Sequence, residues 1–351
     1  MLTQGDCLAL LMHGQLIPGP RSQGKMGHGL LRYGSYPIAA VIDREHAGQT
    51  STDVTGIPGD VPIVATIDEA IQLDANTLIP GIAPPGGILP SSWSDELIHG
   101  LLAGCNLING LHKPMVDDPM YASALQEDSW IWDVRVEPPG LRSGTGAAAA
   151  IDIPRVLTVG TDMAIGKMTV SLECDRAATH LGYRSEFLAT GQIGICISGK
   201  GVPLDAVRVD FAPGSIEQLV MDAAHDKDVL WIEGQGSVLH PASTAWLALI
   251  RGAVPTHLIL CHRAGQETLA RVPSVRIPPL KDVISLFETV ACAGGALTRP
   301  TTVGIAINTS MLTDEEARDY LANVTNETGL PATDPVRYGA AELVHAVFSN
   351  R

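Results

Sequence analysis

Short stretches of this chain are apolar at every position, and they alternate with segments of helical pattern. VLWI at 229–232 and LILC at 258–261 contain no charged or hydrogen-bonding side chain other than a tryptophan and a cysteine. A strand that is covered on both faces reads as such a continuous apolar run. Strands separated by helices indicate parallel βαβ units. We therefore predict an α/β protein built on parallel sheets with helices on both faces.

The alternation runs through both halves of the chain. In the first half we expect strands at Leu8–Met12, Ile38–Asp43, Ile63–Ala65, Thr77–Pro80 and Asn106–Leu111, with helices at Gly27–Tyr33, Thr66–Leu73 and Ser94–Ala103. In the second half we expect strands at Val156–Val159, Ser185–Thr190, Val229–Glu233, His257–Cys261 and Thr302–Asn308. Helices are expected from the loop after 159 to near 182, from 215, and at 242–250, 281–290, 313–328 and 340–349. The capping-box pattern SIEQ at 215–218 predicts the helix start there.

Length and one unusual segment suggest two domains. A single core rarely serves 351 residues. The segment PPGLRSGTGAAAAIDIP at 138–154 is rich in Pro, Gly and Ala and lacks periodicity. We predict a first domain at 1–140, a linker at 141–153 and a second domain at 154–351.

Charge and cysteine usage narrow the class of partner. The net charge of −15 disfavours nucleic acid and anionic membranes, because both require a basic face. No apolar run is long enough to cross a bilayer, and the first basic residue, Arg21, follows the apolar stretch 8–12 rather than preceding it as in a secretory signal. The six cysteines show no disulfide or metal-ligand spacing. We expect a cytoplasmic protein with a small-molecule substrate and no metal site.

One segment predicts a phosphate-binding loop. GTDMAIGKMT follows the apolar run 156–159 and precedes a helix, so backbone N–H groups and the helix N-terminus can converge on an anion. Glycines permit close approach, and Lys167 supplies a point charge. The expected cofactor-binding residues are Gly160, Thr161, Asp162, Met163, Ala164, Ile165, Gly166, Lys167, Met168 and Thr169.

Met168 stands where such loops usually carry Ser or Thr. In nucleoside-triphosphate hydrolases that hydroxyl ligates Mg²⁺, and a thioether is too soft to replace it. Thr169 is rotated by about 100° around the helix. The loop should therefore hold phosphates while holding Mg²⁺ poorly, which favours a phosphate-bearing compound that needs no metal.

A second loop offers candidates for proton transfer. WIEGQGSVLHP at 231–241 ends a strand, so Glu233 should face the same crevice as the phosphate loop. As general base we rank Glu233 first, then Asp162, then His240. A local capping role for Asp162 and a structural role for His240 remain open.

The second half resembles the dethiobiotin synthetase branch of P-loop proteins, through GTDMAIGK and EGQGS. Nearly the whole chain resembles the DgcN-type family. The segments that carry this resemblance are YPIAAVIDREHAGQT, GIAPPGG, INGLHKP, WDVRVEPP, GTDMAIGKMT, ATGQIG, GVPLDAVRVDF and EGQGSVLHPA, in this order. Characterised members of that family are D-glutamate N-acetyltransferases that use acetyl-CoA, and they pair a Rossmann-like N-terminal domain with a P-loop C-terminal domain.

The resemblance implies acetyl transfer from acetyl-CoA to an acidic amino acid, with D-glutamate as the expected acceptor. Coenzyme A carries phosphates and binds without Mg²⁺, which suits the loop with Met168. The alternative is an ATP- and Mg²⁺-dependent ligase or kinase of the dethiobiotin synthetase type. A homo-oligomer is expected in either case.

Substrate carboxylates require cations, with Arg preferred for its fork geometry. Arg263 follows a strand and is the first choice for this role. Further candidates for substrate binding, each placed at a strand end or in a loop, are Thr190, Gln192, Asp210, Gln235 and His112. Asp210 has a capping role as its alternative.

Glycines 24, 27 and 29 resemble a dinucleotide fingerprint only loosely, because their spacing is Gly-x-x-Gly-x-Gly.

Overall fold

The computed structural model describes residues 3, 5–19, 22–87 and 89–349 of the chain. Internal contacts divide it into two compact units. Unit 1 comprises residues 1–137 together with 192–206, and unit 2 comprises 138–191 together with 207–351. The segment 192–206, which the sequence analysis placed in the second domain, thus belongs to unit 1.

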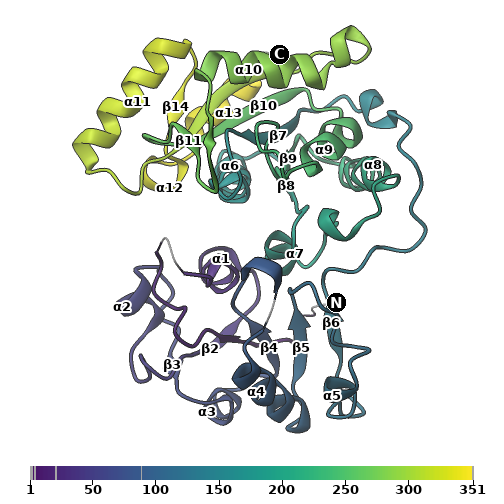
Figure 1. The fold of residues 1–351 in the computed structure, drawn as a ribbon, viewed down its shortest axis with the longest axis vertical. Helices are drawn as coiled ribbons and strands as arrows, with labels where there is room; N and C mark the ends of the chain where they lie inside the picture. Colours follow the sequence, from purple (N-terminus) through teal and green to yellow (C-terminus); the bar gives the residue numbers. More distant parts are fainter. Residues whose placement is uncertain (1–2, 4, 20–21, 88, 350–351) are drawn as a thin grey trace. The chain divides into compact units, whose positions relative to one another are not determined.

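Unit 1 is a parallel six-stranded sheet with the order β3-β2-β1-β4-β5-β6 (Figure 1). Its strands are β1 (Leu8–Leu11), β2 (Ile38–Ile42), β3 (Ile63–Val64), β4 (Thr77–Pro80), β5 (Asn106–Asn109) and β6 (Ile131–Asp133). Its helices are α1 (Lys25–Tyr33), α2 (Ser51–Thr55), α3 (Ile67–Gln72), α4 (Ser91–Leu102), α5 (Pro119–Ala122) and α7 (Gln192–Ser198), with short 3-10 turns at Pro85–Gly87 and Leu204–Ala206. This order is that of the Rossmann fold, in which ligands bind where the strand order reverses, here between β1 and β4.

The loops after β1, β4 and β5 lie at the carboxyl ends of the unit 1 strands. The backbone N–H of Ala83, after β4, donates to the carbonyl of Gln23, after β1, at 2.8 Å. Gly87 has a φ of +67°, and a Cβ there would lie 2.5 Å from the His112 ring. One glycine after β1 permits close packing, because a Cβ on Gly27 would lie 2.2 Å from the Met12 sulfur.

Unit 2 is also a parallel six-stranded sheet, with the order β14-β13-β10-β7-β9-β8. Its strands are β7 (Arg155–Gly160), β8 (Ser185–Leu188), β9 (Val229–Ile232), β10 (His257–Arg263), β13 (Thr301–Asn308) and β14 (Ala332–Thr333). A separate hairpin pairs β11 (Thr268–Leu269) with β12 (Val272–Arg276) in antiparallel fashion. The strand that precedes the phosphate loop, β7, lies in the interior of the sheet.

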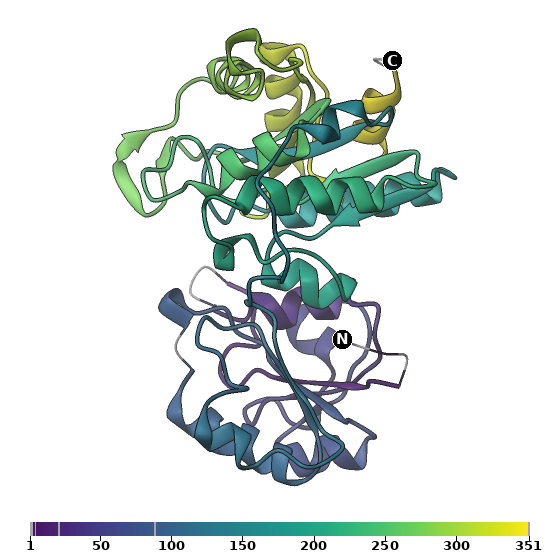
Figure 2. The ribbon, with the colours of Figure 1, turned by 90° about the vertical axis from the view of Figure 1, so that its right-hand side faces the viewer.

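Helices cover both faces of the unit 2 sheet (Figure 2). They are α6 (Lys167–His180), α8 (Ala212–Ala223), α9 (Ala245–Ala253), α10 (Leu280–Ala291), α11 (Asp314–Thr328), α12 (Pro335–Tyr338) and α13 (Ala341–Ser349), with 3-10 turns at Ala147–Ala150 and Ala293–Gly295. Alternate residues of β7 face different layers. Val156 packs in a core with Val170 and Cys174 of α6, whereas Leu157 faces Leu249 of α9. The predicted three-layer α/β architecture is confirmed.

One predicted helix start is wrong. Helix α8 begins at Ala212 rather than at Ser215, and the Ser215 hydroxyl donates to the Ala212 carbonyl inside the helix at 2.8 Å. Pro213 in the first turn sets the start, because its missing N–H is one of the unpaired donors there anyway. Glu217 accepts from the backbone N–H of Thr145 and of Ala147 instead, at 3.0 and 2.8 Å. The predicted linker at 141–153 is therefore hydrogen-bonded to α8.

In the described part of the chain, no helix combines the length and the apolar composition that a membrane span requires.

Candidate functional site

The phosphate loop joins β7 to α6 in a conformation that depends on Gly166. Gly166 has a φ of +109° and is the N-cap of α6, a backbone conformation that side chains disfavour. Ala164 also has a positive φ, +54°, which is uncommon for a residue other than Gly. Strained backbone of this kind is frequent in segments that clamp a ligand. The loop thus lies between a strand and a helix, as the sequence predicts.

Lys167 is buried at the base of this loop. Its ammonium donates to the carbonyl of Asp162 at 2.8 Å, and its side chain is 6% exposed. Burial lowers the pKa of Lys167 to about 8, while the charges of Asp162 and Glu233 oppose that shift. A Cβ on Gly160 would lie 3.3 Å from the ammonium nitrogen. Lys167 is therefore a cation held close to bare backbone, as phosphate binding requires.

Glu233 ties the end of β9 to the end of β8. One of its carboxylate oxygens accepts from the backbone N–H of Thr190 at 2.8 Å and of Gly191 at 3.1 Å. The other accepts from the amide of Gln235 at 3.0 Å. Burial raises the pKa of Glu233 to about 7, against the lowering effect of these hydrogen bonds and of Lys167. The structure therefore brings Glu233, Thr190 and Gln235 together beside the phosphate-loop lysine.

Asp162 connects the phosphate loop to the segment after β10 through hydrogen bonds of its carboxylate. Its carboxylate accepts from the backbone N–H of Met163 at 2.6 Å, from the Gln266 amide at 2.7 Å and from the backbone N–H of Ala270 at 2.8 Å. The last two donors belong to the loop and hairpin that follow β10. With three donors and 2% exposure, this carboxylate is engaged in structure. The arrangement supports the local role that the sequence left open over a role as general base.

His240 presents one ring nitrogen as a hydrogen-bond acceptor and the other as a donor. Its Nδ1 accepts from the backbone N–H of Ala242 at 3.2 Å, so in the neutral ring Nε2 carries the hydrogen. Nε2 is buried and has no hydrogen-bond partner among the described residues. Nε2 is therefore a hydrogen-bond donor for which the described residues supply no acceptor.

The site contains residues that the sequence analysis did not single out. The hydroxyl of Thr158 in β7 accepts from the backbone N–H of Gly234 at 2.9 Å and contacts the Ser171 hydroxyl of α6 at 3.1 Å. The imidazole of His262 lies 2.9 Å from the Thr161 hydroxyl, and burial lowers its pKa to about 4. A signal for Thr158 was present, since it is the one hydrogen-bonding side chain within the run 156–159.

Two glycines around the site have no room for a side chain, because neighbouring protein atoms lie too close. A Cβ on Gly234 would lie 1.7 Å from the Thr158 carbonyl oxygen, and a Cβ on Gly191 would lie 2.5 Å from the Gln235 amide. The Glu-Gly-Gln-Gly loop therefore lies directly against the strand that carries the phosphate loop.

The other predicted substrate residues are spread over both units. Arg263 lies beside the phosphate loop, where its guanidinium donates to the Ala164 carbonyl at 3.3 Å. Asp210 is exposed in the turn before α8, and the N-cap of that helix, Phe211, makes no side-chain capping bond. Gln192 is the first residue of α7, and His112 follows β5, so both belong to unit 1.

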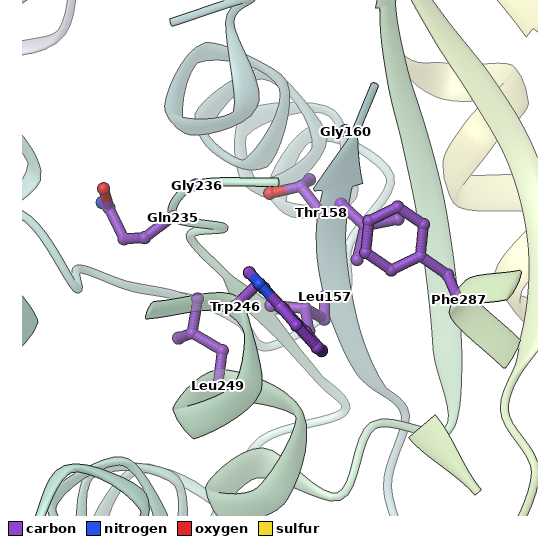
Figure 3. A pocket seen from close by; sticks show the side chains of 9 residues that line it. Leu157, Thr158, Gly160, Gln235, Gly236, Trp246, Leu249 and Phe287 are labelled. Carbon is purple, nitrogen blue, oxygen red and sulfur yellow. The ribbon is translucent and has the colours of Figure 1, made fainter. Parts of the chain in front are cut away.

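A small pocket adjoins the phosphate loop on the α9 side of the sheet (Figure 3). The cavity inside it measures only about 10 Å³, and its lining residues are Leu157, Thr158, Val159, Gly160, Gln235, Gly236, Trp246, Leu249 and Phe287. Sites for whole organic ligands measure about 300–1,000 Å³. The pocket is therefore too small for an entire coenzyme.

A parallel Rossmann-type unit and a P-loop unit with a buried lysine define the class of the protein. The family comparison agrees: residues 44–137 match the DUF1611_N Rossmann-like domain of unknown function, and residues 142–344 match the DUF1611_C P-loop domain. The chain belongs to the DUF1611 family.

Two curated relatives and one solved structure extend this result. The chain is 39% identical over 284 residues to a D-glutamate N-acetyltransferase of Tritonibacter scottomollicae, covering 80% of this chain and 84% of that protein. It is 33% identical over 285 residues to a D-glutamate N-acetyltransferase of a Pseudoalteromonas species, covering 80% and 83%. A crystal structure of a DUF1611 family protein from Anabaena variabilis ATCC 29413 is 51% identical, has a TM-score of 0.94 and covers 98% of this chain and 100% of that chain. The resemblance stated from the sequence is confirmed.

Proposed function

We propose that the protein is an N-acyltransferase that moves the acetyl group of acetyl-CoA to the amino group of an acidic amino acid, with D-glutamate as the acceptor. The observation that carries the proposal is a phosphate loop with a buried Lys167 and no hydroxyl at Met168. It lies in a chain that matches two curated D-glutamate N-acetyltransferases over 80% of its length. Acetyl-CoA supplies the thioester, and its pyrophosphate suits a cradle that does not depend on Mg²⁺.

In this proposal the phosphate loop binds and orients the coenzyme. The N–H groups at the start of α6 and the Lys167 ammonium hold the pyrophosphate. Lys167 now donates to the Asp162 carbonyl, and the phosphate oxygens take over that hydrogen bond. Arg263, bonded only weakly to the loop carbonyl of Ala164 at 3.3 Å, is a second cation for the same phosphates.

Glu233 is the proposed general base that takes a proton from the substrate ammonium. Its pKa of about 7 lies near working pH, where a base is most effective.

The length of the coenzyme restricts how it can bind if Glu233 is the base. The pantetheine arm between pyrophosphate and sulfur has four to five peptide-sized units and extends to about 15 Å. Because Glu233 lies beside Lys167, the arm must fold back for the thioester to approach this carboxylate.

Free thiol release tests the proposal. With acetyl-CoA and D-glutamate in the presence of a metal chelator, we expect stoichiometric formation of thiol and N-acetylglutamate. L-Glutamate and D-aspartate serve as comparison substrates, because they change stereochemistry and chain length separately. Absence of thiol release with every amino acid would overturn the proposal.

A second candidate is an ATP- and Mg²⁺-dependent ligase or kinase. The position of Glu233, buried beside the phosphate-loop lysine, favours it, because P-loop enzymes place a metal-binding carboxylate after a neighbouring strand. The two candidates differ in what they demand of residue 168.

Met168→Ser should create a metal ligand in the phosphate loop. Met168 is half-buried in the first turn of α6, so the change should cost little stability. We expect ATP affinity to rise by at least about tenfold, or about 1.4 kcal/mol, with Mg²⁺ and not with chelator, while acetyl transfer changes little. Calorimetric titration measures both, and Met168→Leu is the matched control without a hydroxyl. Tight Mg·ATP binding by the unaltered protein, with no gain from serine, would place the ligase first.

A further inference from the structure

Three segments that the phosphate site does not use converge on one side chain in unit 1. They are residues 110–113 after β5, residues 134–137 after β6, and the turn Leu204–Ala206. The side chain is that of Arg135. Its Nε donates to the carbonyl of Gly110 at 2.9 Å, and its Nη1 lies 3.3 Å from Nδ1 of His112. The same Nη1 pairs with the carboxylate of Asp205.

The side chain of Arg135 is largely enclosed, and one of its outer nitrogens makes no hydrogen bond to the described residues. The side chain is 11% exposed, and burial lowers the pKa of Arg135, although an arginine stays charged at any working pH. Nη2 makes no hydrogen bond among the described residues, while Nε and Nη1 are engaged. Nη2 is open to solvent. One half of a fork that fits carboxylates is thus accessible to another acceptor.

The partner of Arg135 is far less enclosed than Arg135 itself. The Asp205 side chain is 42% exposed, against 11% for Arg135. It comes from a three-residue 3-10 turn, and it contacts one nitrogen of the guanidinium instead of both outer ones. A carboxylate held this way can leave for solvent at little cost, whereas the guanidinium cannot follow it.

The position in the sheet is one where ligands bind. Arg135, Gly110 and His112 lie just beyond the carboxyl ends of β5 and β6, the edge at which parallel sheets hold ligands. Gly87, from the loop after β4, packs directly on the His112 ring. Burial and the Arg135 charge lower the pKa of His112, so its ring is neutral at pH 7. Its Nδ1 accepts from Arg135 and its Nε2–H is then a further donor.

We propose that Arg135 is the carboxylate-binding residue of a subsite in unit 1, and that the carboxylate of Asp205 occupies the place of the ligand carboxylate until a ligand displaces it. The ligand class is a small mono- or dicarboxylate with two oxygens free for a bidentate contact. The link to an amino-acid acceptor rests on the proposed function, in which an acidic amino acid is acetylated.

Replacing Asp205 distinguishes two roles of the ion pair. Carboxylate affinity should rise if Asp205 competes with the ligand, and should stay the same or fall if the pair is only structural. If Asp205 competes with the ligand, Asp205→Asn should tighten D-glutamate and glutarate binding to the full chain severalfold. Arg135→Lys should weaken both by roughly tenfold or more, because a bidentate contact is lost. Asp228→Asn, which breaks the exposed Arg184–Asp228 pair of unit 2, is the matched control and should change neither. Calorimetry gives the affinities, and thermal melts verify folding.

A merely structural ion pair predicts a different pattern. Asp205→Asn would then lower the melting temperature and leave carboxylate affinity unchanged or weaker, which would overturn the proposal even if Arg135→Lys failed to fold. Glutarate has no amine, so its binding is independent of acetyl transfer. Tighter glutarate binding without thiol release would support the subsite and refute the proposed function. If Asp205→Asn and Arg135→Lys both fold, release thiol and show an unchanged KM for D-glutamate, the proposed function is supported and the subsite is refuted.

Discussion

Glu233→Gln should reduce kcat for acetyl transfer by about 10²- to 10⁴-fold, the usual contribution of a general base. The amide oxygen of glutamine can still accept from the backbone N–H of Thr190 and Gly191, so the strand ends remain joined. Coenzyme affinity should change little. In the unaltered protein, kcat/KM should rise with pH through about 7 as Glu233 loses its proton and fall above about 8 as Lys167 loses its charge. Steady-state rates from pH 5.5 to 9 provide the profile.

Stability supplies the control for this substitution. Burial raises the pKa of Glu233 above its value in the unfolded chain, so its contribution to folding is greatest below that unfolded value and is lost as pH rises through about 7. Glutamine carries no such charge. The melting temperature of Glu233→Gln should therefore gain on that of the unaltered protein between pH 5 and pH 8. Normal kcat with weakened coenzyme binding would instead assign Glu233 to the phosphate end of the site.

Lys167→Ala should weaken coenzyme A binding by about 1.5–3 kcal/mol, or roughly 10- to 150-fold, because it removes a hydrogen bond between charged groups. Lys167→Met should behave alike, since it keeps the buried apolar stem and removes only the charge. Calorimetric titration with coenzyme A measures the effect without turnover.

A surface lysine controls for the change in net charge. Lys281 is exposed on α10 of the same unit, and Lys281→Ala should leave coenzyme affinity unaltered. Equal affinity in the Lys167 variants and the unaltered protein would mean that the pyrophosphate binds away from this loop.

Local sequence signals predicted the frame of the site. The apolar run 156–159, the glycines and Lys167 are consecutive in the chain, and strand, loop and helix formed where expected. Even there, a local pattern misled at Ser215. The capping-box letters are present, but Pro213 lies in the first turn of α8 and the helix starts earlier. Two local signals competed, and the proline determined the start.

What the sequence could not show depends on contacts between distant residues. Two of the three donors to the Asp162 carboxylate come from Gln266 and Ala270, more than a hundred positions away. The ion pair of Arg135 joins it to Asp205 across a stretch that includes residues 138–191 of unit 2. No local sequence motif at either residue of these pairs predicts its partner. Such pairings become visible only when the sheet topology is known, and they decide whether a carboxylate braces a loop or remains available for chemistry.

The most direct test of the account is a crystal structure of the protein with coenzyme A bound. We predict that the pyrophosphate lies within hydrogen-bond distance of the Lys167 ammonium and of backbone N–H groups in the segment 164–168, with no metal ion between them. A pyrophosphate bound elsewhere in the chain would contradict the account, as would a loop that accepts Mg·ATP and excludes coenzyme A.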